Sequence, residues 1–113
     1  MAVIQESEHL ISSEEDIENA SHALKAMAHP LRLKILCLLG AAGEVAVQDI
    51  VEHVGTSQSN ISQHLSILRD NHILASRKDA NKVFYRIGEP RILQLIGAMR
   101  TAFCRQPQSQ PHP

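Results

Sequence analysis

The spacing of apolar residues changes once along this chain, and that change limits the folds available to it. Two short segments, 45–54 and 58–70, carry apolar residues at helical spacing, and Gly55 stands between them. Beyond residue 72 the pattern becomes that of a β-hairpin, because two runs rich in β-branched and aromatic residues flank Asp79-Ala80-Asn81. Two amphipathic helices joined by a glycine-containing turn and followed by a hairpin predict a winged helix-turn-helix centred on Thr56–Asp70.

Helix signals also lie on both sides of this motif. Ser13 with Asp16 three residues later is close to a capping box, and Pro30 suits the first position of a second, mostly apolar helix. We expect Gly40 and Gly43 to end that second helix. The expected helices cover 13–28, 31–39, 45–54 and 58–70, the strands 73–78 and 82–87, and the last helix 90–104. The fold predicted is mainly α with a β-hairpin wing.

The length of 113 residues fits a single domain. Only three residues are aromatic and none is Trp, so the core has to be built from aliphatic side chains, which suits packed helices. Much of the apolar material lies near the two ends, and a homodimer would bury it. We expect a flexible N-terminus over 1–12, a DNA-binding and dimerisation domain over 13–105, and a disordered Gln/Pro-rich tail over 106–113.

No apolar run approaches the roughly 20 residues needed to cross a bilayer. The N-terminus also lacks the basic start and apolar stretch of a signal peptide. We therefore expect a cytoplasmic protein with no membrane partner. Both cysteines, Cys37 and Cys104, would then lie in a reducing compartment, where a permanent structural disulfide is not expected.

Charge is unevenly distributed on a chain whose formal net charge is −1. The first 29 residues hold six acids and one base, whereas residues 56–86 hold five bases and two acids. A basic segment on a nearly neutral chain fits contact with DNA phosphates. An ordinary solvated face would carry the same charges, so this observation alone leaves both readings open.

The second helix of the motif is expected to lie in the major groove of double-stranded DNA. Gln and Asn side chains can pair with adenine, and Ser can serve several bases. The residues expected at bases are Gln58, Ser59, Asn60, Ser62 and Gln63. Thr56 and Ser57 are expected at phosphates near the helix N-terminus, and Arg77, Lys78 and Lys82 at the backbone or minor groove. His64 either contacts a phosphate or packs at the domain surface. A solvated helix face is the alternative, which the adjoining turn and basic hairpin disfavour.

Three segments give the chain a family resemblance. Residues 24–36 read Leu-Lys-Ala-Met-Ala-His-Pro-Leu-Arg-Leu-Lys-Ile-Leu, residues 57–65 read Ser-Gln-Ser-Asn-Ile-Ser-Gln-His-Leu, and residues 83–85 read Val-Phe-Tyr. Together they resemble the ArsR/SmtB family of bacterial regulators over about residues 20–104. The resemblance implies four helices, a two-stranded wing and a final helix, in a homodimer joined through the first and last helices. It also implies a repressor that an inducer releases from its operator, and no enzymatic activity.

Metal-sensing patterns of that family are missing here. One needs a Cys-x-Cys pair in the third helix, and residues 48–53 contain no cysteine. Another needs His or acidic ligands on the last helix, and residues 91–100 contain neither. We therefore expect no metal and no cofactor. An unconventional metal site, with Cys37 or Cys104 beside His22 or His29, remains the alternative for the inducer.

The two cysteines resemble those of the persulfide-sensing branch, of the SqrR, BigR and HlyU type. Carried over, Cys37 and Cys104 would be the sensing pair, which reactive sulfur species link within one subunit so that DNA affinity falls. Thiolate attack and resolution by a second thiol make this chemistry reasonable, and Arg100 and Arg105 would lower the pKa of Cys104. The alternatives are a core role for Cys37 with an incidental Cys104, and a module whose DNA binding is constitutive. A thiol enzyme is not expected, because the chain has no Cys-x-x-Cys motif.

Overall fold

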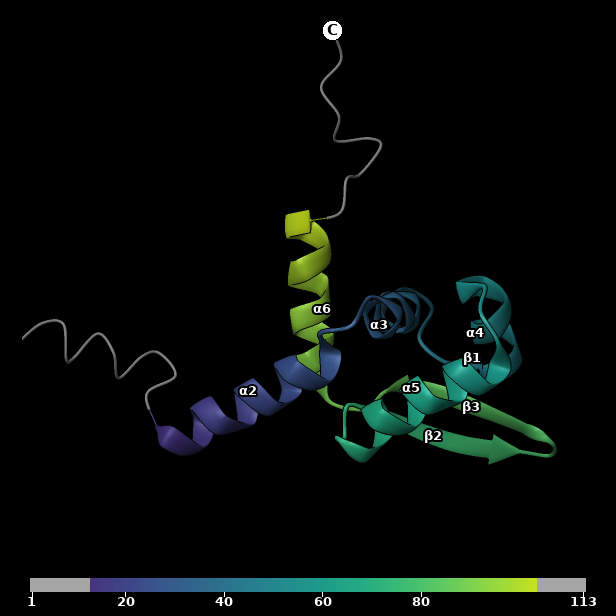
Figure 1. Cartoon of the computed structure of the whole chain (residues 1–113), viewed down its shortest axis with the longest axis horizontal. Coiled ribbons are helices and arrows are strands. Elements are labelled where there is room, and N and C mark those ends of the chain that lie inside the picture. Colours follow the sequence, from purple (N-terminus) through teal and green to yellow (C-terminus); the bar gives the residue numbers. More distant parts are fainter. Residues whose placement is uncertain (1–12, 104–113) are drawn as a thin grey trace, which may run out of the picture.

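The structure is a computed structural model that describes residues 13–103. The segments 1–12 and 106–113, together with Cys104 and Arg105, lie outside the described residues, so the expected domain limits stay predictions. The elements are α2 (Glu14–Met27), α3 (Pro30–Ala42), β1 (Val45–Ala46), α4 (Val47–Val54), α5 (Gln58–Asp70), β2 (Leu74–Asp79), β3 (Lys82–Ile87) and α6 (Pro90–Phe103) (Figure 1). Apart from β1, this is the order of helices and strands expected from the sequence.

The prediction of a helix beginning at Val45 is wrong. Val45 and Ala46 form a short strand that pairs antiparallel with Tyr85 and Phe84. The sheet therefore has three strands in the order β1-β3-β2. Pairing with β3 decides the conformation of these two residues, and that partner lies about forty positions away in the chain, beyond the reach of a local pattern.

The prediction that Gly40 ends the second helix is also wrong, because α3 continues through it to Ala42. A Cβ atom added at Gly40 would lie 3.3 Å from Cγ2 of Ile96 in α6. The missing side chain thus allows α6 to approach α3 closely. Gly43 does end the helix, and its φ of +89° is a conformation that other residues rarely adopt.

Helix α3 occupies the centre of the fold. Its residues Ile35, Leu36 and Leu39 are completely or almost completely buried. It packs against α4, α5, α6 and β3, so the reading motif and the last helix are assembled on one element. The short loop into α3 is fixed by His29, whose Nδ1 accepts a hydrogen bond from the Leu31 amide at 3.1 Å.

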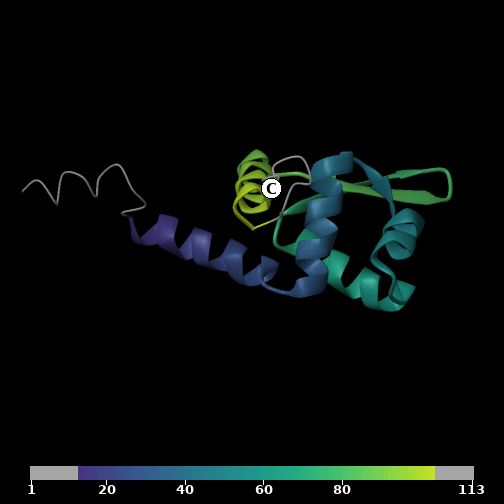
Figure 2. The same cartoon turned by 90° about the horizontal axis from the view of Figure 1, so that it is seen from above.

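Helix α2 leads away from this body, and the hairpin lies at the opposite end of the molecule (Figures 1 and 2). Only the C-terminal end of α2 is anchored, through buried Ala26 and Met27. Apolar side chains remain exposed along α2 and α6, including Ile17, Leu24 and Leu93. These two helices therefore present apolar surface that the single chain does not cover.

Candidate nucleic-acid interface

The start of α5 is built by the turn that precedes it. Gly55 adopts a left-handed conformation that ends α4, and Ser57 caps α5 by accepting a hydrogen bond from the Asn60 amide at 3.2 Å. The side-chain amide of Asn60 in turn donates to the Thr56 hydroxyl at 3.2 Å. The structure thus brings Thr56, Ser57 and Asn60 together, and it pairs the side chains of Thr56 and Asn60 with each other.

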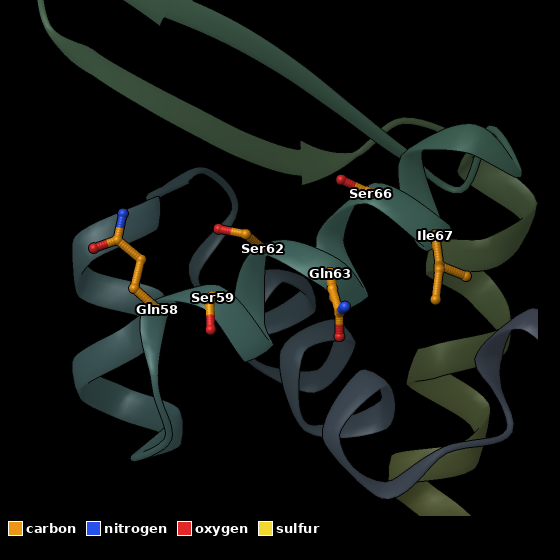
Figure 3. Close-up of a pocket in the computed structure, with 6 residues that line it drawn as sticks. All are labelled: Gln58, Ser59, Ser62, Gln63, Ser66 and Ile67. Atoms are coloured by element: carbon orange, nitrogen blue, oxygen red, sulfur yellow. The ribbon is translucent and has the colours of Figure 1, made fainter.

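Helix α5 separates apolar from polar residues around its circumference. Ile61, Leu65 and Leu68 are at most 1% exposed and hold the helix on the core. The exposed side is lined by Gln58, Ser59, Ser62, Gln63, Ser66 and Ile67, which border a shallow, open groove (Figure 3). Their spacing places 58, 62 and 66 in one row and 59, 63 and 67 in the next. Four of the five residues expected at bases therefore share one accessible face.

His64 does not belong to that face. It is 9% exposed, and its ring centroid lies 4.5 Å from that of His29. Its Nδ1 accepts a hydrogen bond from Nε of Arg32 at 3.3 Å. Burial lowers the pKa of His64 below its ordinary value, and the nearby His29 and Arg32 lower it further. His64 thus packs inside the domain, and we leave it out of the surface offered to DNA.

Arg77 of the wing is exposed, but its guanidinium is paired with other residues of the protein. Its guanidinium donates to both carboxylate oxygens of Glu44, at 2.9 and 2.8 Å, and lies 4.6 Å above the ring centroid of Phe84. Asp79 adds a longer ion pair at 3.8 Å. The hydrogen bond from Arg77 lowers the pKa of Glu44 and raises the pKa of Arg77. Glu44 was not expected at this site, since no local signal links it to a residue 33 positions later.

The tip of the wing is the two-residue turn between β2 and β3. Lys82 directly follows this turn and Lys78 lies one residue before Asp79, which precedes it; both lysines are exposed. Lys82 lies beside a second hollow, with a volume of about 270 Å³, which it shares with Gln58 and Ser62 of α5. The fold therefore brings wing and helix residues that are about twenty positions apart to one surface.

The structure places Cys37 in α3, half-buried and packed against the core. Cys104 lies outside the described residues, although α6, which leads to it, packs on α3. Within residues 13–103, no group of three or more His, Cys, Asp or Glu side chains is arranged to hold a metal ion. Over the same residues, no helix is both long and apolar enough to span a membrane.

Sequence comparison finds similarity to bacterial regulators. Residues 29–75 match the family model described as bacterial regulatory protein, arsR family. The chain is 35% identical over 96 residues to the biofilm growth-associated repressor of Xylella fastidiosa strain Temecula1, covering 81% of this chain and 83% of that protein. It is 34% identical over 100 residues to the transcriptional activator HlyU of Vibrio cholerae serotype O1, covering 88% and 92%.

Solved structures of similar fold agree with this. HlyU from Vibrio cholerae matches with a TM-score of 0.79 at 34% identity, covering 82% of this chain and all of that one. A structure of reduced HlyU from the same species matches with a TM-score of 0.77 at 35% identity, covering 81% and 96%. The predicted winged helix-turn-helix fold is thereby confirmed. In helix-turn-helix proteins the second helix of the motif lies in the major groove, and α5 is that helix here.

Proposed function

The chain belongs to the arsR family of bacterial regulatory proteins, and on that premise we propose that it is a homodimeric, cytoplasmic repressor whose operator affinity falls when reactive sulfur species link Cys37 to Cys104. The coarser statement, a DNA-binding transcriptional regulator of the ArsR family, follows from the comparisons. Its relatives are named as regulators of transcription, so the chain is not an enzyme.

The observation that carries DNA reading is the exposed polar face of α5. The exposed residues of this face are Gln58, Ser59, Ser62 and Gln63, and the opposite side of the helix is buried in the core. A helix held in this way presents hydrogen-bonding side chains in a fixed register, as readout of base edges requires. Ser57 would meet a phosphate at the N-terminus of α5, where backbone amides point outward.

The unpaired apolar surface of α2 and α6 supports a homodimer. Leu24 and Ile17 in α2 are 53% and 52% exposed, and Leu93 and Phe103 in α6 are 47% and 84% exposed. Burying such side chains against a second copy would stabilise the pair by about 25 cal/mol for each Å² of apolar surface removed from water. Two copies related by a two-fold axis would present two α5 helices to successive major grooves.

The inducer chemistry rests on the two thiols. A sulfane sulfur donor RS–SH first transfers its outer sulfur to one cysteine, giving Cys–S–SH and releasing RSH. The second thiolate then attacks the inner sulfur, which forms the Cys37–Cys104 disulfide and releases hydrogen sulfide. If both thiols are first converted to persulfides, their reaction instead leaves a trisulfide and releases one hydrogen sulfide. In each case the donor is reduced and the cysteines are oxidised.

The position of Cys37 supports a link between this chemistry and DNA binding. Cys37 is half-buried in α3, the helix on which α5 and α6 both pack. Close packing leaves little room for an added sulfur or a new crosslink without a shift of a neighbouring helix. Such a shift would alter the relation between α5 and the dimer-forming helices, and two half-sites on one duplex tolerate little change of that kind.

DNA reading is tested with a duplex selected from a random library by the reduced protein. Gln63→Ala should weaken binding to the selected duplex much more than binding to unrelated duplexes, because a base contact discriminates between sequences. Lys25→Ala, on exposed α2, serves as the control and should leave both affinities unchanged. A reduced protein that is folded but binds no duplex at low salt would overturn the proposal.

The sulfur switch is tested on the same duplex with glutathione persulfide, glutathione disulfide, zinc and arsenite in separate arms. We expect loss of affinity with the persulfide, together with a mass change that corresponds to a disulfide or trisulfide within one chain. Cys37→Ser and Cys104→Ser should each abolish that loss. Retained affinity after complete modification of both thiols would refute the switch, and release by zinc or arsenite alone would instead favour a metal-responsive repressor.

A further inference from the structure

Arg32 connects two helices that have different tasks in the proposed repressor. Its Nη1 donates a hydrogen bond of 2.6 Å to the Ala26 carbonyl in the last turn of α2, and its Nε donates one of 3.3 Å to Nδ1 of His64 in α5. Helix α2 carries exposed apolar side chains for a second copy, and α5 carries the polar face for DNA. One half-buried guanidinium therefore fixes the end of the proposed dimer helix to the inner side of the reading helix.

The hydrogen bond to His64 defines which nitrogen of that ring is protonated. A guanidinium only donates, and it keeps its charge at any pH at which a protein is folded. Nδ1 of His64 accepts from it and so carries no hydrogen, which leaves the ring proton of the neutral imidazole on Nε2. A second proton would have to enter at Nδ1, where it would point at the Nε–H group of Arg32. Protonation of His64 and its hydrogen bond to Arg32 therefore exclude each other.

Within the described part of the chain, His64 is surrounded by bases and uncharged residues. The titratable or charged groups that act on it are His29, whose ring centroid lies 4.5 Å away, and Arg32. Nδ1 of His29 already accepts a hydrogen bond from the Leu31 amide. Of the other elements packed on α5, α2, α4 and β2 bury only uncharged residues. Burial, and then the two bases, lower the pKa of His64, so the closed arrangement holds a neutral ring.

The position of His64 in α5 connects its protonation to DNA reading. It follows Gln63, one of the exposed residues expected at bases, and precedes Leu65, which is 1% exposed. A charged ring that leaves this packed place displaces the inner side of α5, while Arg32 can stay on the carbonyl of α2. Two copies would present two α5 helices to one duplex, and half-sites a fixed distance apart tolerate little change in the placement of those helices.

We propose that Arg32 is a positioning residue for DNA reading, which sets α5 relative to α2 through neutral His64, and that proton uptake at Nδ1 of His64 opens this contact and releases the operator. The inference rests on the proposed function and adds a control by pH to it. The sign of the effect is diagnostic. Protonated histidines ordinarily strengthen DNA binding, because added positive charge attracts phosphates, whereas protonation of His64 weakens it.

The test measures the affinity of the reduced wild-type protein for the selected duplex at constant salt, from about pH 8 to about pH 5. We expect constant affinity above pH 6.5 and, below it, a loss that approaches about tenfold per pH unit for each protomer that releases a proton on binding. Circular dichroism and sedimentation should show a folded dimer throughout. Unchanged or stronger binding at acid pH would overturn the inference, as would a loss that coincides with unfolding or with dissociation into monomers.

Two histidine variants assign the pH dependence. His64→Asn keeps an acceptor oxygen close to the place of Nδ1 and takes up no proton, so it should bind at neutral pH and lose most of the pH dependence. His53→Gln, exposed in α4, is the matched control and should keep the dependence of the wild-type protein. Nitrogen NMR spectra of the wild-type protein give the same information without a variant. They should show the proton of His64 on Nε2 and a further fall of its pKa when the duplex binds, and a rise of that pKa would overturn the inference.

The spacing of half-sites separates positioning from stability. At neutral pH the wild-type protein should reject duplexes whose half-sites are moved by one base pair, and folded Arg32→Met, at low temperature, should reject them less strictly. Equal rejection by both proteins would overturn the positioning role of Arg32. Failure of the reduced wild-type protein to bind any duplex at any of these pH values would refute the proposed function itself, whereas binding with the opposite pH dependence refutes this inference alone.

Discussion

Arg32→Met is expected to loosen the reading helix from the scaffold that supports it. Nη1 of Arg32 donates to the Ala26 carbonyl at the end of α2 at 2.6 Å, and Nε donates to Nδ1 of His64 in α5 at 3.3 Å. One guanidinium thus joins the last turn of α2 to the inner face of α5. Methionine keeps much of the apolar stem and removes both hydrogen bonds.

The magnitude follows from those two bonds. A hydrogen bond from a charged donor contributes about 1.5–3 kcal/mol, and the bond to His64 is long enough to count for little. We therefore expect Arg32→Met to lower the free energy of unfolding by about 2 kcal/mol, mostly through the bond to Ala26. For a domain of this size that corresponds to a fall in melting temperature of about 8–16 °C.

The pH dependence gives the prediction a second, independent readout. The pKa of His64 is lowered in the folded protein, first by burial and then by His29 and Arg32. The unfolded chain therefore binds more protons than the folded one between the lowered pKa and the ordinary value of 6.5. The contribution of neutral His64 to the free energy of unfolding is fully present above pH 6.5, and this contribution is lost as the pH falls through the window. Arg32→Met removes one of the cations that lower the pKa of His64. The pH range over which His64 affects stability should therefore narrow, although burial still lowers this pKa.

The assay is thermal unfolding followed by circular dichroism, at one fixed protomer concentration and at several pH values from 5 to about 8. Lys34→Met is the matched control, because Lys34 is exposed in the same helix and its loss changes the net charge equally. A melting temperature and a pH profile of Arg32→Met that match those of Lys34→Met would refute the reasoning. A wider pH window in Arg32→Met would refute the assignment of the His64 pKa.

Three further outcomes are expected. Ser57→Ala removes the cap of α5 and should lower the free energy of unfolding by about 1 kcal/mol in urea titrations, whereas Ser57→Asp should retain most of it. Glu44→Gln removes the carboxylate that holds Arg77 and so makes Arg77 available to a DNA phosphate. The slope of log K for DNA binding against log salt should then steepen by about one unit, whereas an unchanged slope would show that Arg77 stays with the wing. Leu24→Glu should make the protein monomeric in analytical ultracentrifugation, while Ile67→Glu, on the reading helix, should leave it dimeric; a Leu24→Glu dimer would exclude α2 from the interface.

The reading motif was predictable because its signals are local. A glycine that ends the preceding helix, Thr56 or Ser57 as a cap, and apolar residues at helical spacing were enough to define α5 over 58–70, as the structure has it. The hairpin was predictable from its composition and its short polar turn. The strand β1 was not, since two residues carry no period and only their pairing with Tyr85 and Phe84 defines them.

Side-chain partners within the candidate site were harder to foresee. Residue type and helical spacing predicted which face of α5 is polar, but not that Asn60 donates to Thr56 or that Arg77 is held by Glu44. These bonds depend on the rotamers and the relative placement of elements, which a pattern of residue types does not contain. The inward position of His64 is of the same kind, because a histidine fits either the surface or a stacked, hydrogen-bonded interior.

The distribution of contacts along α3 connects the proposed parts of the protein. Its first turn holds α5 through Arg32 and His64, and its last turns lie against α6 at Gly40, where a Cβ atom would already crowd Ile96. Cys37 lies between these two places on the same helix. A helix transmits displacement along its axis because its backbone hydrogen bonds resist bending, and a tightly packed neighbour has to follow. A sulfur crosslink at Cys37 would therefore act on α5 and α6 together, and a few kcal/mol of difference between linked and reduced states would suffice to release the operator.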